Sequence, residues 1–505
     1  MSPVQRVLVI GELGRQYAMA HRQDAPLLAI PLQADDGGGQ RAVEFLRPAD
    51  TAAVEVLALP TLTRIASGLA QTWAGTAMAA ALRALLPGGD TARLGPLMLL
   101  RLHDGGQRDG GQRDGGQRLV ELMMCSRLRA AGALFTRAAR FTADPSASLD
   151  VLMGQAWRLA KSLQDNILSE NEVCTHFESG TEIETKIALG GDTSPWSLAT
   201  LLSEAVGGAE LPGLIPDVGN EMQRWQTRQH SYEVLAPAAE AGYVAFIASA
   251  AGRYSFKQKR FATEGLRRPE SFRLDLPIDE GHFDRYLEKE FPHLETRRLP
   301  SHTRAKFDVN VESAGTGHFF GIEIDEVTVV GSGEVMRQVE IEYHRSWIHD
   351  GLSPDTIEPE LERITGLILA FLHRRGVAAQ RTYYSKLSFL RDTLDPPSAT
   401  GRIAIMDVDP TTAAAARGLD RPLVYVIMPG TPLEHLSARH TNIYSVDFTS
   451  PGFPGFVDRV LRPLAPQAIV AGSIRSARAA ALASAQLGLR PPDTATMAIV
   501  NGAAS

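Results

Sequence analysis

Polar and apolar residues alternate along much of the segment from residue 180 to about residue 345. In the stretch "GTEIETKIAL", Glu182, Glu184 and Lys186 occupy every second position, with apolar residues or threonine between them. A strand places residues two apart on the same face, so these three charged side chains are predicted to point the same way. The same period recurs in "SYEVLAP", "GYVAFIAS", "RYSFKQKRF", "ESFRLDLP", "HTRAKFDVNVES", "FFGIEIDEVTVV" and "MRQVEIEYHRS". The pattern predicts an antiparallel sheet with one apolar and one polar face.

Two segments beside this predicted sheet have helical periodicity instead. Residues 148–170 repeat apolar side chains at helical spacing, beginning with Leu149. Residues 356–375 do the same, and Gly376 follows them as a stop signal. Apolar stripes of this kind face a hydrophobic core. A closed barrel would turn the charged faces of the strands inward, and the helices would cover its apolar outside.

The two ends of the chain differ from this central segment. Residues 1–145 predict strands, a helix over 61–86 and a hairpin-like pair around three copies of "DGGQR" at 104–118, which we expect to form a flexible loop. Pro396 and Pro397 mark a predicted linker, and buried-type strands alternate with helical stretches from residue 401 onward. That alternation predicts a small parallel α/β layer domain.

These patterns predict an α+β protein of three domains, in agreement with the length of 505 residues. We expect an N-terminal α/β region over 1–145 and a central antiparallel β tunnel or barrel with covering helices over 146–395. A small C-terminal α/β domain is expected over 400–505.

The composition excludes several classes of protein. Hydrophobic residues make up 44% and charged residues 22%, as in ordinary globular proteins. The formal net charge of −7 argues against nucleic acid as a partner. No uncharged apolar run of 18 residues is present, so we expect no membrane span. The two cysteines, Cys125 and Cys174, form no metal-spacing motif, and the N-terminus lacks a signal-peptide pattern, so a cytoplasmic location is predicted.

Charges of one sign occur in pairs along the predicted sheet. Carboxylates are paired at positions 182/184 and 340/342, and bases at 257/259 and 304/306. Periodicity alone favours a solvated face, but a solvated face usually mixes signs along each strand. Paired carboxylates supply oxygen ligands for Mg²⁺ or Mn²⁺. Paired bases donate to phosphate oxygens, so the segregated pairs suit a site for a cation and a polyanion.

The opening strand and the order of the later strands resemble a known family. "EIETK" resembles the Glu-x-Glu-x-Lys strand of the CYTH superfamily, the triphosphate tunnel metalloenzymes, which include class IV adenylyl cyclases, thiamine triphosphatases and inorganic tripolyphosphatases. The family's later motifs resemble, in order, "FKQKR", "HTRAKF", "GIEIDEV", "VEIEY" and "YYSKL". The resemblance covers roughly residues 178–395. One departure is that "YVAFIAS", which has no base, occupies the place of an Arg-x-Arg strand.

The resemblance implies roles for individual residues of a charged tunnel. The implied metal ligands, for Mg²⁺ or Mn²⁺, are Glu182, Glu184, Glu340 and Glu342. The implied phosphate ligands are Lys257, Lys259, Arg304, Lys306 and Lys386. Lys186 would act on the phosphates during catalysis, and Asp325 would assist the metal or orient water. The implied chemistry is metal-assisted phosphoryl transfer.

Three hypotheses about function follow from this resemblance. The first is a divalent-metal-dependent phosphohydrolase that acts on an inorganic, thiamine or nucleoside triphosphate. The second is a nucleotide cyclase of the class IV type. The third is a non-catalytic protein that binds a phosphorylated ligand or serves as a scaffold. Each has a triphosphate-containing or otherwise phosphorylated small molecule as partner, and none specifies an oligomeric state.

A second, shorter similarity lies in the C-terminal part. Asp407-x-Asp409 after an apolar strand resembles the first motif of haloacid-dehalogenase-type phosphatases, but we find no later acidic motif. The end of a strand followed by a helix that starts at Asp-Pro-Thr-Thr explains these residues better. Gly472, Ser473 and Arg475 are predicted to form a strand-to-helix turn.

Overall fold

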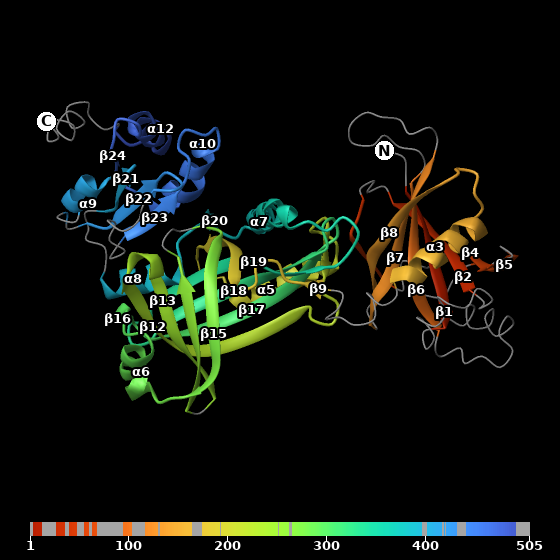
Figure 1. Ribbon diagram of the computed structural model, residues 1–505, viewed down its shortest axis with the longest axis horizontal. Coiled ribbons are helices and arrows are strands. Elements are labelled where there is room, and N and C mark those ends of the chain that lie inside the picture. The colour runs from red at the N-terminus through yellow and green to blue at the C-terminus, as the bar shows by residue number, and fades with distance from the viewer. Residues whose placement is uncertain are drawn as a thin grey trace.

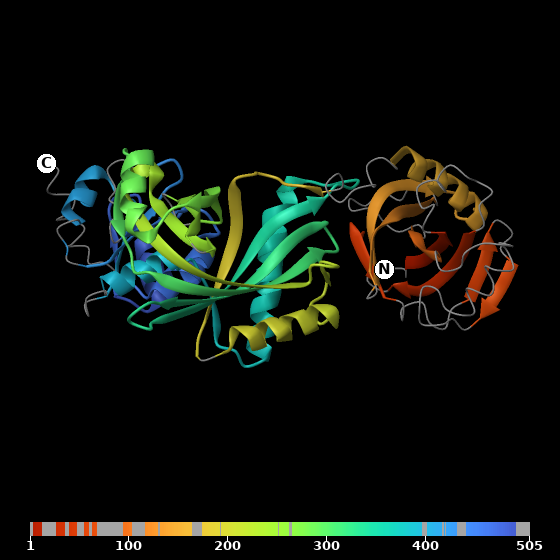
Figure 2. The ribbon, with the colours of Figure 1, turned by 90° about the horizontal axis from the view of Figure 1, so that it is seen from below.

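The computed structural model of the protein contains three parts that follow one another along the chain (Figure 1). An N-terminal sheet is followed by a central barrel and then by a C-terminal α/β layer, and the barrel lies between the other two (Figure 2). The structure describes residues 4–12, 27–35, 40–47, 55–59, 63–67, 94–103, 117–129, 132–163, 174–191, 193–250, 252–261, 265–395, 401–416, 419, 421–431 and 441–490.

The N-terminal part is an antiparallel sheet of eight strands in the order β3-β8-β7-β6-β1-β2-β4-β5. In chain order they are β1 (Val4–Glu12), β2 (Leu27–Asp35), β3 (Val43–Leu46), β4 (Glu55–Leu59), β5 (Thr63–Ser67), β6 (Leu94–His103), β7 (Arg118–Arg129) and β8 (Gly132–Ala143). The predicted helix over 61–86 is wrong at β5, because pairing with β4 outweighs the helical composition. The rest of that prediction and nearly all of the "DGGQR" loop lie outside the described residues.

The helix predicted after this sheet is present as α3 (Leu149–Leu163). Its apolar face, which includes Leu152 and Trp157, packs into one core with Val9 and Leu100 of the N-terminal sheet. Our expected boundary after residue 145 had assigned this helix to the tunnel. The helix belongs with the N-terminal sheet, because periodicity predicts the buried face of a helix but not which sheet covers that face. The other domain limits stay predictions.

The central part is a closed antiparallel barrel of eight strands, which confirms the predicted β tunnel. Around the barrel the strands are β10 (Thr181–Leu189), β15 (Arg267–Pro277), β14 (Arg253–Arg260), β13 (Gly242–Ala250), β12 (Met222–Ala236), β17 (His302–Ser313), β18 (His318–Val329) and β19 (Val335–Trp347). Pairing of β12 with β17 and of β19 with β10 closes the ring. Short strands β9 (Cys174–Thr175), β11 (Leu214–Pro216), β16 (Glu295–Arg298) and β20 (Ala379–Thr382) pair at its edges.

Helices cover the apolar outside of the barrel, as the alternation of the strands requires. α5 (Pro195–Gly207) and α7 (Ile357–Arg374) pack on β10 and β17–β19 in one buried core that contains Ile187 and Ile341. On another side, α6 (Phe283–Glu290) packs on β12–β14, where the rings of Phe246 and Phe283 stack 4.0 Å apart. Because the apolar side chains point outward into these contacts, the alternate polar side chains point inward.

The two ends of the barrel meet different parts of the molecule. At one end, α8 (Lys386–Leu394) inserts Leu387 and Leu390 into a buried cluster with Leu299 and Val329. At the other end, Ala42 beside β3 donates its N–H to the carbonyl of Ala314, 2.7 Å away, between β17 and β18. The N-terminal sheet therefore docks at one end of the barrel, and α8 closes the opposite end.

The C-terminal part is a parallel sheet of four strands in the order β23-β22-β21-β24, which confirms the predicted α/β layer. Its elements are β21 (Ile403–Met406), α9 (Pro410–Ala416), β22 (Leu423–Ile427), β23 (Thr441–Ser445), α10 (Phe453–Phe456), the π-helical turn η8 (Val457–Leu461), α11 (Arg462–Leu464), β24 (Ala468–Ala471) and α12 (Ala477–Leu487). Asp409 caps α9, because its Oδ1 accepts the N–H of Thr412 at 2.6 Å. Arg475 binds Asp407 at 2.6 Å across the turn after β24.

Among the described residues, no helix is long and apolar enough to span a membrane.

Candidate functional site

The register of β10 turns its three charged residues into the barrel. Glu184 lies opposite Glu342 and Lys186 lies opposite Glu340 on β19. The alternate residues point outward: Ile187 is fully buried under α7, and Thr185 hydrogen-bonds Thr365 of α7 at 2.6 Å. Directly paired residues of neighbouring strands share a face, so β19 adds two carboxylates to the inner surface.

Bases from β14 neutralise the first carboxylates. Lys257 Nζ lies 3.0 Å from Glu182, and Lys259 Nζ lies 2.7 Å from Glu184 and also pairs with Glu182. Lys186 bridges two strands, because its Nζ lies 2.8 Å from Glu184 and contacts Glu340. Opposite charges thus meet in the interior from three different strands.

A second set of bases comes from β17 and α8. Arg304 donates to Asp325 at 2.6 Å and lies 3.3 Å from Glu340. Lys386, the first residue of α8, contacts the same two carboxylates at 2.7 and 2.8 Å. On β17, Lys306 pairs with Glu323 at 2.7 Å.

All of the residues predicted for the site therefore line the inside of one barrel. The structure brings together the predicted metal ligands, phosphate ligands and catalytic residues, and the roles assigned to them stay predictions. Asp325 is fully buried and held by two bases, which fits a positioning role better than free movement toward water.

The sequence analysis missed several inner residues. Arg268 of β15 is 2% exposed and lies 3.0 Å from Glu184, so it supplies a base although the expected Arg-x-Arg strand, now β13, has none. The predicted strand begins at Glu270, after Pro269, and so leaves Arg268 out. The alternation of Arg268, Glu270 and Phe272 would have identified it. Glu323 of β18, to which the sequence assigned no role, also lies inside.

Charge pairing holds several of the inner carboxylates ionised. Burial opposes ionisation of Glu182, but Lys259 and Lys257 outweigh it and hold the pKa of Glu182 well below its usual value. Burial likewise opposes ionisation of Glu323, but Lys306 and Arg304 lower its pKa to about 2. Such groups remain anionic at neutral pH and can accept a cation without losing a proton first.

Glu342 differs from Glu182 and Glu323 in this respect. Burial, together with the negative charges of Glu323, Glu182 and Glu184, raises the pKa of Glu342 well above its usual value. Among the described residues, none forms a hydrogen bond or ion pair with it. Glu342 is therefore a carboxylate in an excess of negative charge, and a cation would relieve that excess.

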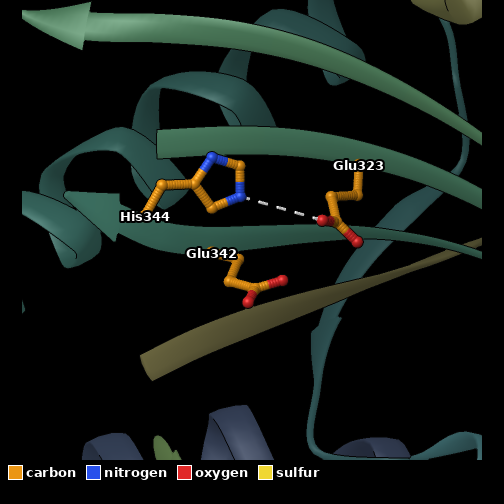
Figure 3. Close-up of side chains that lie close together, drawn as sticks. All are labelled: Glu323, Glu342 and His344. Carbon is orange, nitrogen blue, oxygen red and sulfur yellow. Dashed lines mark ion pairs between the residues drawn. The ribbon is translucent and has the colours of Figure 1, made fainter. Parts of the chain in front are cut away.

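Two groups of side chains inside the barrel are close enough to share an ion. Donor atoms of Glu323, Glu342 and His344 all lie within 4.8 Å of one another, and so do those of Glu323, Asp325 and Glu340. In the first group, His344 Nε2 lies 4.0 Å from Glu323, and Glu342 extends beside both (Figure 3). The second group is already occupied by Arg304 and Lys386.

The donor chemistry of the first group fits the predicted Mg²⁺ or Mn²⁺, since carboxylate oxygens dominate it. The grouping differs from the ligand set implied by the resemblance, because it adds Glu323 and His344. Glu182 and Glu184 lie close to it but are held by bases.

A glycine makes room for this group. Gly321 lies opposite Glu342 on the inner face of β18, and a Cβ atom there would lie 2.6 Å from Cε1 of His344. The histidine ring can occupy its place only because residue 321 has no side chain.

Comparison with protein-family models finds no match, and neither does comparison with curated proteins. Among solved structures, the Pct1 RNA triphosphatase of S. pombe in complex with the Spt5 CTD is similar at 11% identity and a TM-score of 0.18, over 43% of this chain and 84% of that one. The di-domain ARO/CYC StfQ from the steffimycin biosynthetic pathway is similar at 8% identity and a TM-score of 0.14, over 74% of this chain and 99% of that one. TM-scores this low carry no argument about this protein.

Proposed function

We propose that this protein is a divalent-metal-dependent phosphohydrolase that acts on a triphosphate inside the barrel. The observation that carries the proposal is the inner surface of the closed barrel, where carboxylates and bases from different strands meet in direct contact. A wet sheet face would hold such charges in solvent, whereas Glu184, Lys186 and Glu340 are each less than 5% exposed. Burial of this many charges is costly, so a functional reason is required.

The bases of the barrel are suited to hold a polyanion. One wall carries Lys257, Lys259 and Arg268. The other wall carries Arg304 and Lys306, and α8 adds Lys386 at the closed end. Each now binds a carboxylate. Phosphate oxygens would take over these donors as charge-assisted acceptors, and the bases would neutralise charge that develops during phosphoryl transfer.

Glu342 and Glu323 are the proposed holders of the metal ion, with His344 beside them. When bound, the metal would supply positive charge that polarises phosphate oxygens and favours an attacking hydroxide. The carboxylates of Glu182 and Glu184 would keep Lys259 and Lys186 in place around the phosphates.

The test is phosphate release from tripolyphosphate, thiamine triphosphate and ATP with Mg²⁺ or Mn²⁺. We expect Glu342→Gln to reduce turnover by at least about 10–100-fold, the usual loss when even an outer-shell partner of a metal ligand is removed. Glu326→Gln is the matched control: it lies on β18 but pairs with Arg337 at 2.7 Å, away from the inner charges.

Three results, from this assay, from product analysis with ATP or from binding measurements, would contradict the proposal. Unchanged turnover in Glu342→Gln would remove the metal assignment, and cyclic products from ATP would favour a cyclase. Metal-dependent binding without any product would favour a non-catalytic ligand-binding protein.

A further inference from the structure

Two large aromatic side chains face into the barrel and are half exposed. Trp225 of β12 is 52% exposed and Phe272 of β15 is 51% exposed. Trp225 lies opposite Lys306, and Phe272 lies opposite Lys257. Since directly paired residues share a face, both rings lie on the inner surface beside predicted phosphate ligands.

Both rings lie at the end of the barrel away from α8. Along the inner face of β12, exposure falls from Trp225 to Ser231 and Glu233, which are buried. Along β15 it rises from the buried Arg268 to Phe272. β12 begins and β15 ends at the same end of the barrel, because the three pairings from β12 to β15 are all antiparallel. Inner side chains therefore reach solvent at this end, which we call the open entrance of the barrel.

Neighbouring groups fix the orientation of both rings. The indole Nε1 of Trp225 donates to Asp308 Oδ2 at 3.1 Å. Lys257 Nζ lies 5.0 Å from the centroid of the Phe272 ring. Asp308 holds the edge of the indole, and Lys257 lies over one face of the Phe272 ring. Both rings still leave about half of their surface exposed, as expected of platforms on which a planar ring stacks.

We infer that Trp225 and Phe272 form a subsite for a planar aromatic ring attached to the triphosphate. This inference rests on the proposed function and narrows its substrate to a nucleoside triphosphate or another triphosphate that carries such a ring. The ring of the substrate would lie at the entrance, and its phosphates would extend from the bases beside Trp225 and Phe272 deeper into the barrel. Inorganic tripolyphosphate has no ring and would leave both platforms exposed.

The test compares substrates with and without a ring. In Trp225→Ala and Phe272→Ala we expect the KM for ATP, GTP or thiamine triphosphate to rise about ten-fold or more, the usual effect of losing one stacking partner. The KM for tripolyphosphate should stay unchanged. Trp225→Phe keeps a ring and should restore most of the affinity, which a purely structural role of the indole hydrogen bond would not predict.

Trp196→Ala is the matched control, because Trp196 of α5 is 53% exposed but lies outside the barrel against Phe307. Its KM values should equal those of the wild type. Comparison of the nucleotides with thiamine triphosphate distinguishes a nucleobase from a thiamine ring. The KM of the natural class of substrate should rise most in Trp225→Ala and Phe272→Ala.

Unchanged KM values for every ring-bearing substrate in Trp225→Ala, or an equal loss for tripolyphosphate, would overturn the inference and leave the phosphohydrolase intact. If no triphosphate is hydrolysed at all, the proposed function fails. Calorimetry with ATP and tripolyphosphate in the presence of Mn²⁺ then decides the inference: a loss of ATP affinity alone in Trp225→Ala supports it, and any other result overturns it.

Discussion

At the residue scale, Gly321 shows how closely the inner groups of the barrel are packed. A methyl group at this position would meet the ring of His344 and push it away from Glu323 and Glu342. Substitution by a larger residue in a well-packed site costs about 1–3 kcal/mol, because neighbouring groups must shift. We therefore predict that Gly321→Ala lowers the stability to denaturant and weakens the binding of Mn²⁺ measured by calorimetry.

A glycine in a helix provides the control for this prediction. Gly366 of α7 has open space where a Cβ atom would lie, so Gly366→Ala should keep or raise stability and leave Mn²⁺ binding unchanged. The double variant Gly321→Ala/His344→Ala should recover much of the lost stability, because the clash is removed. Wild-type stability and Mn²⁺ affinity in Gly321→Ala alone would show that the two residues are not in contact.

The identity of inner residues could be predicted where alternation was regular. Glu182, Glu184 and Lys186 follow it without interruption, and the register of β10 agrees. Arg268 was missed because Pro269 follows it and proline usually marks the edge or end of a strand. The grouping of His344 with Glu342 and Glu323 depends on which strands become neighbours, which a single sequence does not contain.

At the element scale, β10 has two faces with different tasks. Its outward Ile187 is fully buried in the core with α7, whereas its inward Lys186 contacts two carboxylates. We predict that Ile187→Ala lowers the free energy of unfolding by about 2–5 kcal/mol and leaves phosphate release per folded molecule unchanged. Lys186→Met should reduce phosphate release per folded molecule by at least ten-fold, because a donor to the phosphates is lost.

Urea unfolding monitored by circular dichroism and a phosphate-release assay on the folded fraction measure these two effects separately. A large loss of turnover per folded molecule in Ile187→Ala would contradict the assignment of faces. So would full activity in Lys186→Met.

The kinds of element were predictable where one periodicity persisted over many residues. The barrel strands and α7 follow such patterns. The helix over 61–86 failed at β5, since an edge strand formed by sheet pairing carries little local signal. The partner of α3 was also beyond the sequence, because an amphipathic helix packs on any apolar sheet face.

At the scale of the whole molecule, the N-terminal sheet adjoins the open entrance of the barrel. It contacts the barrel through Ala314, Phe319 and Trp347, at the strand ends nearest to the start of β12. Arg127 of β7 forms a buried ion pair with Asp217 at this junction. The junction thus combines an apolar core with a buried ion pair, and breaking such a pair is costly.

The opposite end is covered by α8, whose first residue, Lys386, also reaches the inner carboxylates. The proposed triphosphate would therefore enter from the end of Trp225 and Phe272, with its phosphates extending toward Lys386. Among the described residues, the charged interior of the barrel thus lies between the end covered by α8 and the end where Trp225 and Phe272 are exposed.

The most direct test of this account is a crystal structure of the protein with Mn²⁺ and tripolyphosphate, in which anomalous scattering locates the metal. We predict a manganese peak within coordinating distance of Glu323 and Glu342, with phosphate oxygens contacted by Lys257, Lys259 or Arg304. Metal and phosphate found only outside the barrel, with the inner bases still bound to their carboxylates, would contradict the claim that the barrel binds a metal-bound triphosphate.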